Sequence, residues 1–260
     1  MSRQVTMTVT PEHPSPGSKP MPWGLWPTLG FSAVILFGNL ASGIMAAAGL
    51  VASGENPALG TDPGQLASNG MLVALSILIS SPLVLGLTLF FANLRRGPTV
   101  KDYLGLHEVD WRTTVRWLLL LVLFAAISDL ITVLLERPII SDVMFNVYRT
   151  ATPKPLLLIA LVLAAPISEE IFFRGFLFYG IQNTRLGPKG AILLSSLVWT
   201  ILHIQYDLYN LAVVMVLGLL LGYARLKGKS VYIPIVMHAL MNSIAAMEVM
   251  LQISMTSPTP

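Results

Sequence analysis

Long apolar runs separated by short polar breaks dominate the sequence from residue 25 to residue 252. A helix of about 20 apolar residues can cross the hydrocarbon core of a bilayer. Runs that approach or exceed this length cover residues 25–52, 71–92, 114–135, 156–181, 190–206, 208–224 and 231–252. Glycine and proline, which favour turns, mark most of the breaks. The pattern predicts an all-α, polytopic membrane helix bundle with about seven (seven or eight) transmembrane helices.

Composition points to the same class of protein. The chain is 54% hydrophobic and only 11% charged, whereas a soluble domain carries roughly 25% charged residues. It contains no cysteine, which excludes disulfides, thiol catalysis and cysteine metal sites. The basic residues cluster in the loops, as expected for a membrane protein, so the high pI does not indicate a nucleic-acid partner. We therefore expect membrane lipid to surround the protein.

The distribution of basic residues predicts an orientation. With the N-terminus inside, the cytoplasmic segments hold twelve lysines and arginines and the outer segments hold three. The twelve are Arg3, Lys19, Arg95, Arg96, Lys101, Arg112, Arg116, Arg185, Lys189, Arg225, Lys227 and Lys229, and the three are Arg137, Arg149 and Lys154. This bias predicts a multi-pass plasma-membrane protein with a cytoplasmic N-terminus. Seven spans place the C-terminus outside, and an eighth would reverse it.

The domain organisation is simple. Residues 1–24 are polar and proline-rich, so we expect a disordered N-terminal tail. Residues 25–252 form a single transmembrane bundle, and residues 253–260 form a short C-terminal tail. A signal peptide ending near residue 48 is the alternative for the first apolar run, but a retained helix fits its length better.

Six polar side chains within the predicted spans are candidates for a functional site. They are Glu169, Glu170, Arg174, His203, His238 and Asn242. An ionisable residue at bilayer depth costs several kcal/mol unless it is paired or faces a wet cavity. Glu170 and Arg174 stand four residues apart and share a helix face. Glu169 points about 100° around the helix from Glu170, so we expect Glu170 to pair with Arg174 and Glu169 to face a cavity.

Each of these residues has a simpler structural interpretation when it is taken alone. A single histidine or Asn242 can bond a neighbouring helix, and Glu170 with Arg174 can be a structural ion pair. Asp129 and Glu248 lie near the predicted outer ends of spans and are interpreted as solvated caps. Two carboxylates, an arginine, two histidines and an asparagine on three spans exceed what packing requires.

The chemistry that this set supports is water activation. A carboxylate held away from water is a stronger base, and a histidine beside it can orient the water or carry its proton. A second histidine and an asparagine amide can donate to a developing oxyanion, a role worth roughly 3–4 kcal/mol per donor. There is no Gly-x-Ser-x-Gly motif for a serine nucleophile.

Zinc chemistry is the alternative. His203 and His238 with either Glu169 or Glu170 form a two-histidine, one-carboxylate ligand set that leaves a position open for water. The sequence has no His-Glu-x-x-His motif, so no cofactor is the first expectation and zinc is the second.

Three motifs carry a resemblance to a known family. Residues 166–175 read Pro-Ile-Ser-Glu-Glu-Ile-Phe-Phe-Arg-Gly, residues 199–203 read Trp-Thr-Ile-Leu-His, and residues 234–242 end in His-Ala-Leu-Met-Asn. Their order and spacing resemble the CAAX prenyl protease and bacteriocin-processing (CPBP, or Abi) family of intramembrane proteases, related to the Ras-converting enzyme. The resemblance covers about residues 155–245, the expected protease core. Trp199 stands where the family usually has phenylalanine, and we expect its ring to preserve the packing.

The resemblance implies a role for each residue. Glu169 would be the general base on water, assisted by His203. His238 and Asn242 would form the oxyanion hole. Glu170 and Arg174 would support the site. The implied activity is that of a glutamate-dependent, metal-free intramembrane endopeptidase.

The sequence predicts a peptide or a membrane-associated protein as the substrate, cut near the cytoplasmic face, and it does not indicate the oligomeric state. A non-catalytic immunity or scaffold protein that uses the same polar core is the alternative from another functional class. One difficulty is depth. Counted at ~1.5 Å per residue from the cytoplasmic ends, Glu169 and His203 lie about 20 Å deep but His238 only about 12 Å.

Overall fold

The computed structural model describes residues 22–54 and 63–256, and all of its elements are helical. In chain order the helices are α1 (Leu25–Ala52), α2 (Pro63–Ser68), α3 (Gly70–Leu94), α4 (Val100–Leu104), α5 (Trp111–Leu134), α6 (Asp142–Thr150), α7 (Lys154–Ile159), η2 (Ala160–Ala164), α8 (Ala165–Glu170), η3 (Ile171–Leu177), α9 (Phe178–Gln182), α10 (Gly187–Ile201), α11 (Leu208–Gly228) and α12 (Tyr232–Thr256). Almost all of the expected tail over residues 1–24 lies outside the described residues. At the other end, α12 continues past residue 253 to Thr256.

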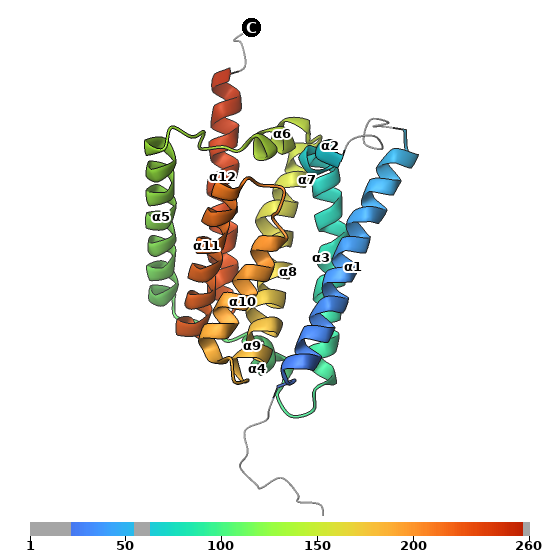
Figure 1. The fold of residues 1–260 in the computed structure, drawn as a ribbon, viewed down its shortest axis with the longest axis vertical. Coiled ribbons are helices and arrows are strands. Elements are labelled where there is room, and N and C mark those ends of the chain that lie inside the picture. Colours follow the sequence, from blue (N-terminus) through green and yellow to red (C-terminus); the bar gives the residue numbers. More distant parts are fainter. Residues whose placement is uncertain (1–21, 55–62, 257–260) are drawn as a thin grey trace, which may run out of the picture.

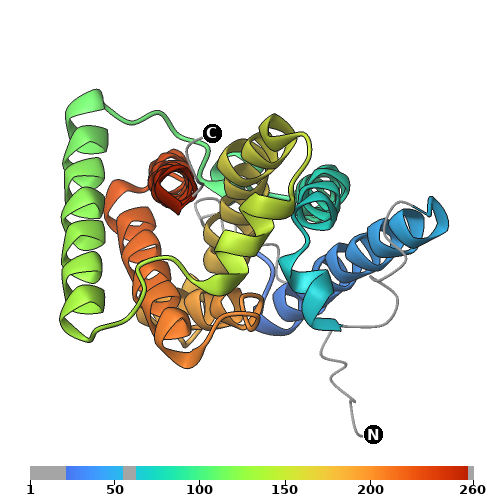
Figure 2. The ribbon, with the colours of Figure 1, turned by 90° about the horizontal axis from the view of Figure 1, so that it is seen from above.

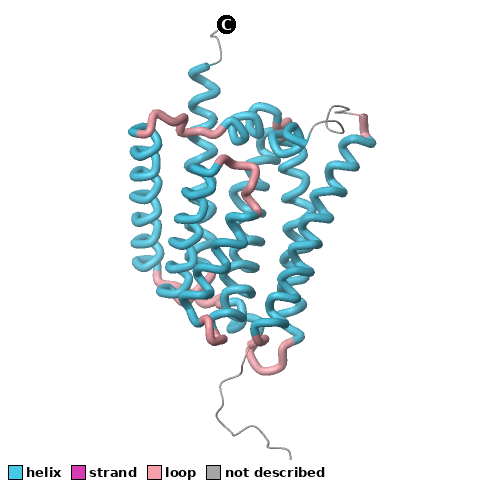
Figure 3. The backbone as a smooth tube through the Cα atoms, viewed as in Figure 1, coloured by secondary structure: helices cyan, strands magenta, loops and turns pink. Residues whose placement is uncertain are grey.

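The predicted polytopic helix bundle is confirmed. Within the described ranges, six helical segments are long and apolar enough to cross a membrane. The remaining apolar run, predicted over residues 190–206, forms α10, which has only 15 residues. The prediction of a helix as far as residue 206 was wrong over its last part, because the chain turns at residues 202–206 before Asp207 caps α11. Figure 3 shows this turn, in pink, reaching into the bundle.

The helices run between two ends of the bundle, which are named here by the short helices that lie on them (Figure 1). At the α4 end, α1 begins, α3 ends and the α11–α12 turn contacts the segment after α4, where the Val231 N–H donates to the Gly105 carbonyl at 2.9 Å. At the α6 end, α3 begins and the Gly70 N–H donates to the Thr150 hydroxyl of α6 at 2.8 Å. The hydrophobic pattern does not predict these short surface helices, because each is too short to form an apolar run of membrane-spanning length.

The segment from α7 to α9 is one continuous helix through the middle of the bundle (Figure 2), in contact with α3, α10, α11 and α12. It contains two widened π-helical turns, η2 and η3, on either side of the six-residue α8. Such turns are frequent at functional sites. Pro166 follows the first of them and contributes no N–H to the helix. The two glutamates of the first motif therefore lie on a short α-helical stretch between two irregular turns.

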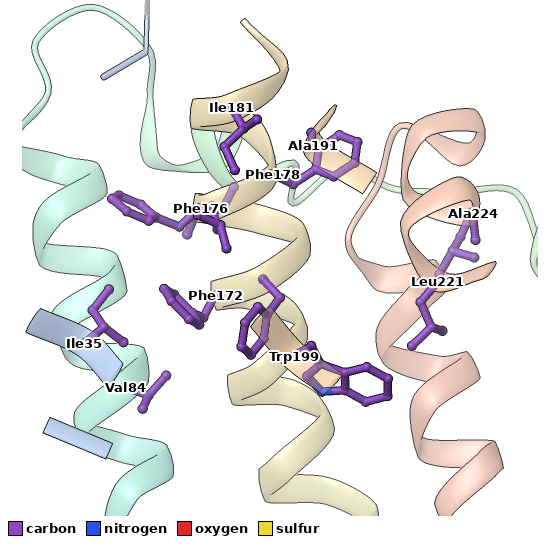
Figure 4. Packing of buried hydrophobic residues seen from close by; sticks show 14 of the residues in the cluster. Ile35, Val84, Phe172, Phe176, Phe178, Ile181, Ala191, Trp199, Leu221 and Ala224 are labelled. Carbon is purple, nitrogen blue, oxygen red and sulfur yellow. The ribbon is translucent and has the colours of Figure 1, made fainter. Parts of the chain in front are cut away.

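A hydrophobic cluster fills the half of the bundle toward the α4 end. Phe172, Phe176 and Phe178 project from the central helix into this cluster, and each is almost completely buried. Figure 4 shows these rings between Ile35 and the α11 side chains that close the other side. The same cluster includes residues of α4, so it extends to that end of the molecule. This half of the bundle is a solid apolar core.

The difficulty over depth is resolved by where the turns lie. Figure 1 shows the α9–α10 turn reaching further toward the α4 end than the α11–α12 turn. The first residues of α12 therefore start deeper in the bundle than a count from a common membrane boundary assumes. This brings His238 level with Glu170, to which it is hydrogen-bonded at 3.0 Å.

The close approach of α10 and α11 depends on Gly218. A Cβ atom built there would lie 3.1 Å from both Ser196 Cβ and Trp199 Cε3. We predict that Gly218→Leu lowers the free energy of unfolding by about 1–3 kcal/mol, because the side chain has no space between the helices. The matched control is Gly86→Leu, since nothing lies within 4 Å of a Cβ at Gly86. Thermal unfolding in detergent measures both, and equal effects would contradict the prediction.

Candidate active site

The buried carboxylate of Glu170 is the centre of a charged network. Its Oε1 accepts hydrogen bonds from Arg174 Nη1 at 2.9 Å and from His238 Nδ1 at 3.0 Å. Glu170 and Arg174 are fully buried, and His238 is 4% exposed. Arg174 Nη2 also donates to the Gly218 carbonyl at 3.2 Å, and its guanidinium lies 4.9 Å from the Trp199 ring centre. The predicted pairing of Glu170 with Arg174 is confirmed, and it links the central helix to α10, α11 and α12.

Glu169 has different surroundings from its neighbour. It is partly exposed and lines a cavity, as predicted. Its Oε2 accepts a 2.6 Å hydrogen bond from the Trp199 indole N–H, whereas its Oε1 has no hydrogen-bond partner among the described residues. The sequence analysis expected Trp199 only to pack. The signal for its second role was the replacement of phenylalanine by the aromatic residue that carries an N–H donor.

His203 lies in the turn after α10, not on the helix itself. Its Nδ1 is 2.9 Å from the Trp199 carbonyl oxygen. Because a carbonyl can only accept, Nδ1 carries a proton, and Nε2 is the ring nitrogen left for another partner. The His203 ring lies edge-on to the Trp199 ring, with 4.8 Å between centres, and Trp199 meets the His238 ring in the same way at 5.4 Å. The indole therefore separates and orients the two imidazoles.

Asn242 donates its Nδ2–H to the Leu161 carbonyl at 2.7 Å. Sequence explains why this carbonyl needs a side-chain donor. In the π-helical turn, the Ala165 N–H bonds to the Ala160 carbonyl, and the next residue, Pro166, has no N–H to give. The Leu161 carbonyl is thus left without its backbone donor. Asn242 satisfies it across two helices, which is the structural role that the sequence analysis gave as an alternative.

A cavity of about 770 Å³ runs beside these groups. Of the six candidates, Glu169, His203, His238 and Asn242 line it, while Glu170 and Arg174 lie behind its wall. Asp129 and Glu248 also line it. Both are partly exposed.

Two polar residues lie where the cavity meets the α6 end. Tyr206 stacks on the His203 ring with 6.1 Å between centres, and burial raises the pKa of its phenol, which stays a neutral donor. Asp207 pairs with Arg137 at 2.7 Å. The hydrogen bond from the Asn210 N–H, with the nearby Arg137, holds the pKa of Asp207 below its usual range. The turn between α10 and α11 is therefore held at Tyr206 by ring stacking and at Asp207 by an ion pair.

The residues as placed do not fit a three-ligand zinc site. Across residues 22–54 and 63–256, no three His, Cys, Asp or Glu side chains are grouped so that they could hold a metal ion. Glu170 Oε1, one of the expected ligands, is already shared by Arg174 and His238.

The sequence was compared with models of protein families and with known proteins. Residues 151–244 match a family model described as type II CAAX prenyl endopeptidase Rce1-like. This matched segment contains all three motifs. The family resemblance seen in the three motifs is therefore confirmed, at nearly the same boundaries. No curated protein and no solved structure matches the chain.

The matched segment contains all six candidate residues but only part of the cavity wall. The N-terminal helices α1 and α3 contribute a long apolar side, with residues such as Leu40, Ile44 and Ile77. α5 contributes Asp129 and Thr132. The candidate residues thus lie within the matched segment, while much of the cavity wall lies outside it.

The role of Asn242 generates a prediction about stability. We expect Asn242→Leu to lower the free energy of unfolding by roughly 1–3 kcal/mol, because it leaves the Leu161 carbonyl without a donor. The neighbouring Ser243→Ala is the matched control. The Ser243 hydroxyl donates to the Ala239 carbonyl of its own helix. That carbonyl keeps its backbone N–H partner in the variant, so we expect the free energy of unfolding to change by no more than about 0.5 kcal/mol. Chemical denaturation in detergent compares the two, and an unchanged Asn242→Leu variant would refute the assignment.

Proposed function

We propose that this protein is an intramembrane endopeptidase that hydrolyses a peptide bond with water activated by Glu169. The family match supports a CAAX-type membrane protease. The observation that carries the finer proposal is the unequal placement of the two glutamates. Glu170 is fully buried and compensated by Arg174 and His238, whereas Glu169 keeps one carboxylate oxygen free at the cavity.

In this mechanism Glu169 takes a proton from water as the water attacks the peptide carbonyl. The bond from Trp199 fixes Oε2, so that Oε1 is aimed at the cavity with little freedom to rotate. Such fixed placement contributes to the rate because it is established before the reaction. The proton then passes from Glu169 to the leaving amine, as general acid–base catalysis requires.

The histidines act through their Nε2 atoms, because both Nδ1 atoms are bound. In the neutral form, His203 Nε2 accepts a hydrogen bond from the water and orients it. His238 can donate to the oxyanion only when Nε2 also carries a proton. The Glu170 carboxylate at its Nδ1 is placed to stabilise that positive charge. The second N–H of the Asn242 amide is the other oxyanion donor in this proposal.

We further propose that the bundle lies in the plasma membrane with its N-terminus in the cytoplasm. The excess of lysine and arginine at the α4 end supports this orientation. Its partners are then membrane lipid and a peptide or membrane-associated protein substrate, and the proposed mechanism needs no cofactor.

The first test replaces the proposed base. We expect Glu169→Gln to remove cleavage, with a fall of at least about 100-fold, because general-base catalysis typically contributes 10²–10⁴-fold. Since the substrate is unidentified, the measurement is quantitative proteomics of new peptide termini in membranes from cells that produce either the wild type or the variant. Termini that persist in the variant would contradict the proposal.

Glu170→Gln is the matched control for that test. It makes the same change one residue away but leaves the buried Arg174 charge uncompensated, so we expect it to destabilise the fold by about 3–5 kcal/mol. Glu169→Gln should leave the melting temperature nearly unchanged. A non-catalytic scaffold would behave differently, since its phenotype would survive Glu169→Gln at normal protein levels.

A second prediction concerns metal dependence. We expect the purified protease to retain its activity after dialysis against EDTA and in the presence of 1,10-phenanthroline, because the proposed mechanism uses only the chain's own groups. The measurement is cleavage of a substrate identified in the proteomic experiment. Loss of activity that zinc alone restores would establish the zinc mechanism instead.

A further inference from the structure

The cavity occupies only one half of the bundle. In α3 its lining residues run from Leu72 to Val84, and none comes from the last ten residues of that helix. In α11 they run from Tyr209 to Leu217, again in the half toward the α6 end. The other half is filled by the aromatic cluster around Phe176 (Figure 4). The cavity lining in these two helices therefore lies in the half toward the α6 end.

A route to the outside is visible at the α6 end. A smaller pocket of about 230 Å³ shares several lining residues with the main cavity, among them Ser141, Gln205 and Tyr206. Its other walls include Arg137 and Asp207, whose side chains are 40% and 51% exposed. The catalytic cavity thus leads to the surface between the turn after α10 and the segment that joins α5 to α6.

The two ends of the bundle differ strongly in charge. Of the described lysines and arginines, those at the α4 end are Arg95, Arg96, Lys101, Arg112, Arg116, Arg185, Lys189, Arg225, Lys227 and Lys229, against the acids Asp102, Glu108 and Asp110. Those at the α6 end are Arg137, Arg149 and Lys154, against Glu136, Asp142 and Asp207. Lysine and arginine concentrate on the cytoplasmic side of membrane proteins. The open half of the bundle is therefore the half that faces away from the cytoplasm.

We propose that the active-site cavity opens on the non-cytoplasmic face and that the substrate is an extracytoplasmic segment of an exported or membrane-anchored polypeptide. This inference rests on the proposed function, because it takes Glu169 as the base. It replaces the expectation of a cut near the cytoplasmic face. A C-terminus prenylated in the cytoplasm would approach the half of the bundle that the aromatic cluster fills, on the opposite side from the cavity.

The experiment uses the absence of cysteine from the chain, which makes single-cysteine labelling possible without background changes. Glu108→Cys and Glu136→Cys introduce the same substitution before and after α5, at exposed positions on opposite ends. Gln205→Cys, with Ile139→Cys as a second position, places the label in the cavity wall near its mouth. Each full-length variant is exposed to a membrane-impermeant maleimide in intact cells and again after permeabilisation.

We expect Glu136→Cys and both cavity positions to label to completion in intact cells, and Glu108→Cys to label only after permeabilisation. Labelling of Glu108→Cys in intact cells would overturn the orientation. If Glu136→Cys were labelled while both cavity positions stayed protected, the proposal that the cavity opens on this face would be overturned. Because labelling does not require catalysis, its outcome is independent of the Glu169→Gln experiment. The proposed peptidase activity would be refuted only by cleavage that persists in Glu169→Gln.

Discussion

A single buried carboxylate holds the polar centre of this bundle together. Glu170 lies in an apolar interior, where an uncompensated charge would cost several kcal/mol, and its Oε1 is shared by an arginine on its own helix and a histidine on α12. Arg174 in turn reaches a carbonyl of α11 and the face of the Trp199 ring on α10. Four helices thus depend on one carboxyl group. Because Glu169 is the next residue, about 100° around the helix, fixing Glu170 inward also fixes the direction in which Glu169 points.

The central helix is irregular where it carries these residues, and side chains from elsewhere repair its backbone. In hydrocarbon each unpaired carbonyl must find a donor within the protein. Asn242 supplies one for Leu161 beside the first widened turn, and Arg225 donates to the Arg174 carbonyl at 2.9 Å within the second. Both donors come from the neighbouring helices, α12 and α11. The irregular turns therefore also fix the positions of α11 and α12 along the central helix.

The sequence predicted the parts of this arrangement that follow from length and spacing. Apolar runs gave the bundle, and the four-residue spacing gave the Glu170–Arg174 pair. The widened turns were not predicted, because hydrophobic periodicity hardly changes when one residue is added to a turn. The end of α10 at Ile201 was not predicted for a related reason, since Leu202 and Ile204 are apolar although the backbone turns there. The half-filled bundle could not be predicted either, because an apolar pattern does not distinguish a side chain facing lipid from one packed against a neighbouring helix.

Trp199 gives this site a spectroscopic property. Its indole N–H is bonded to the carboxylate of Glu169, its ring lies near the Arg174 guanidinium, and an imidazole meets it from each of two other segments. Indole emission responds to nearby charge and to hydrogen bonding. The other four tryptophans of the chain lie near α1 and on α5, away from these groups. The contribution of Trp199 to the emission should therefore change with the charge and occupancy of the candidate site, so that a variant lacking the other four tryptophans would report binding without an added label.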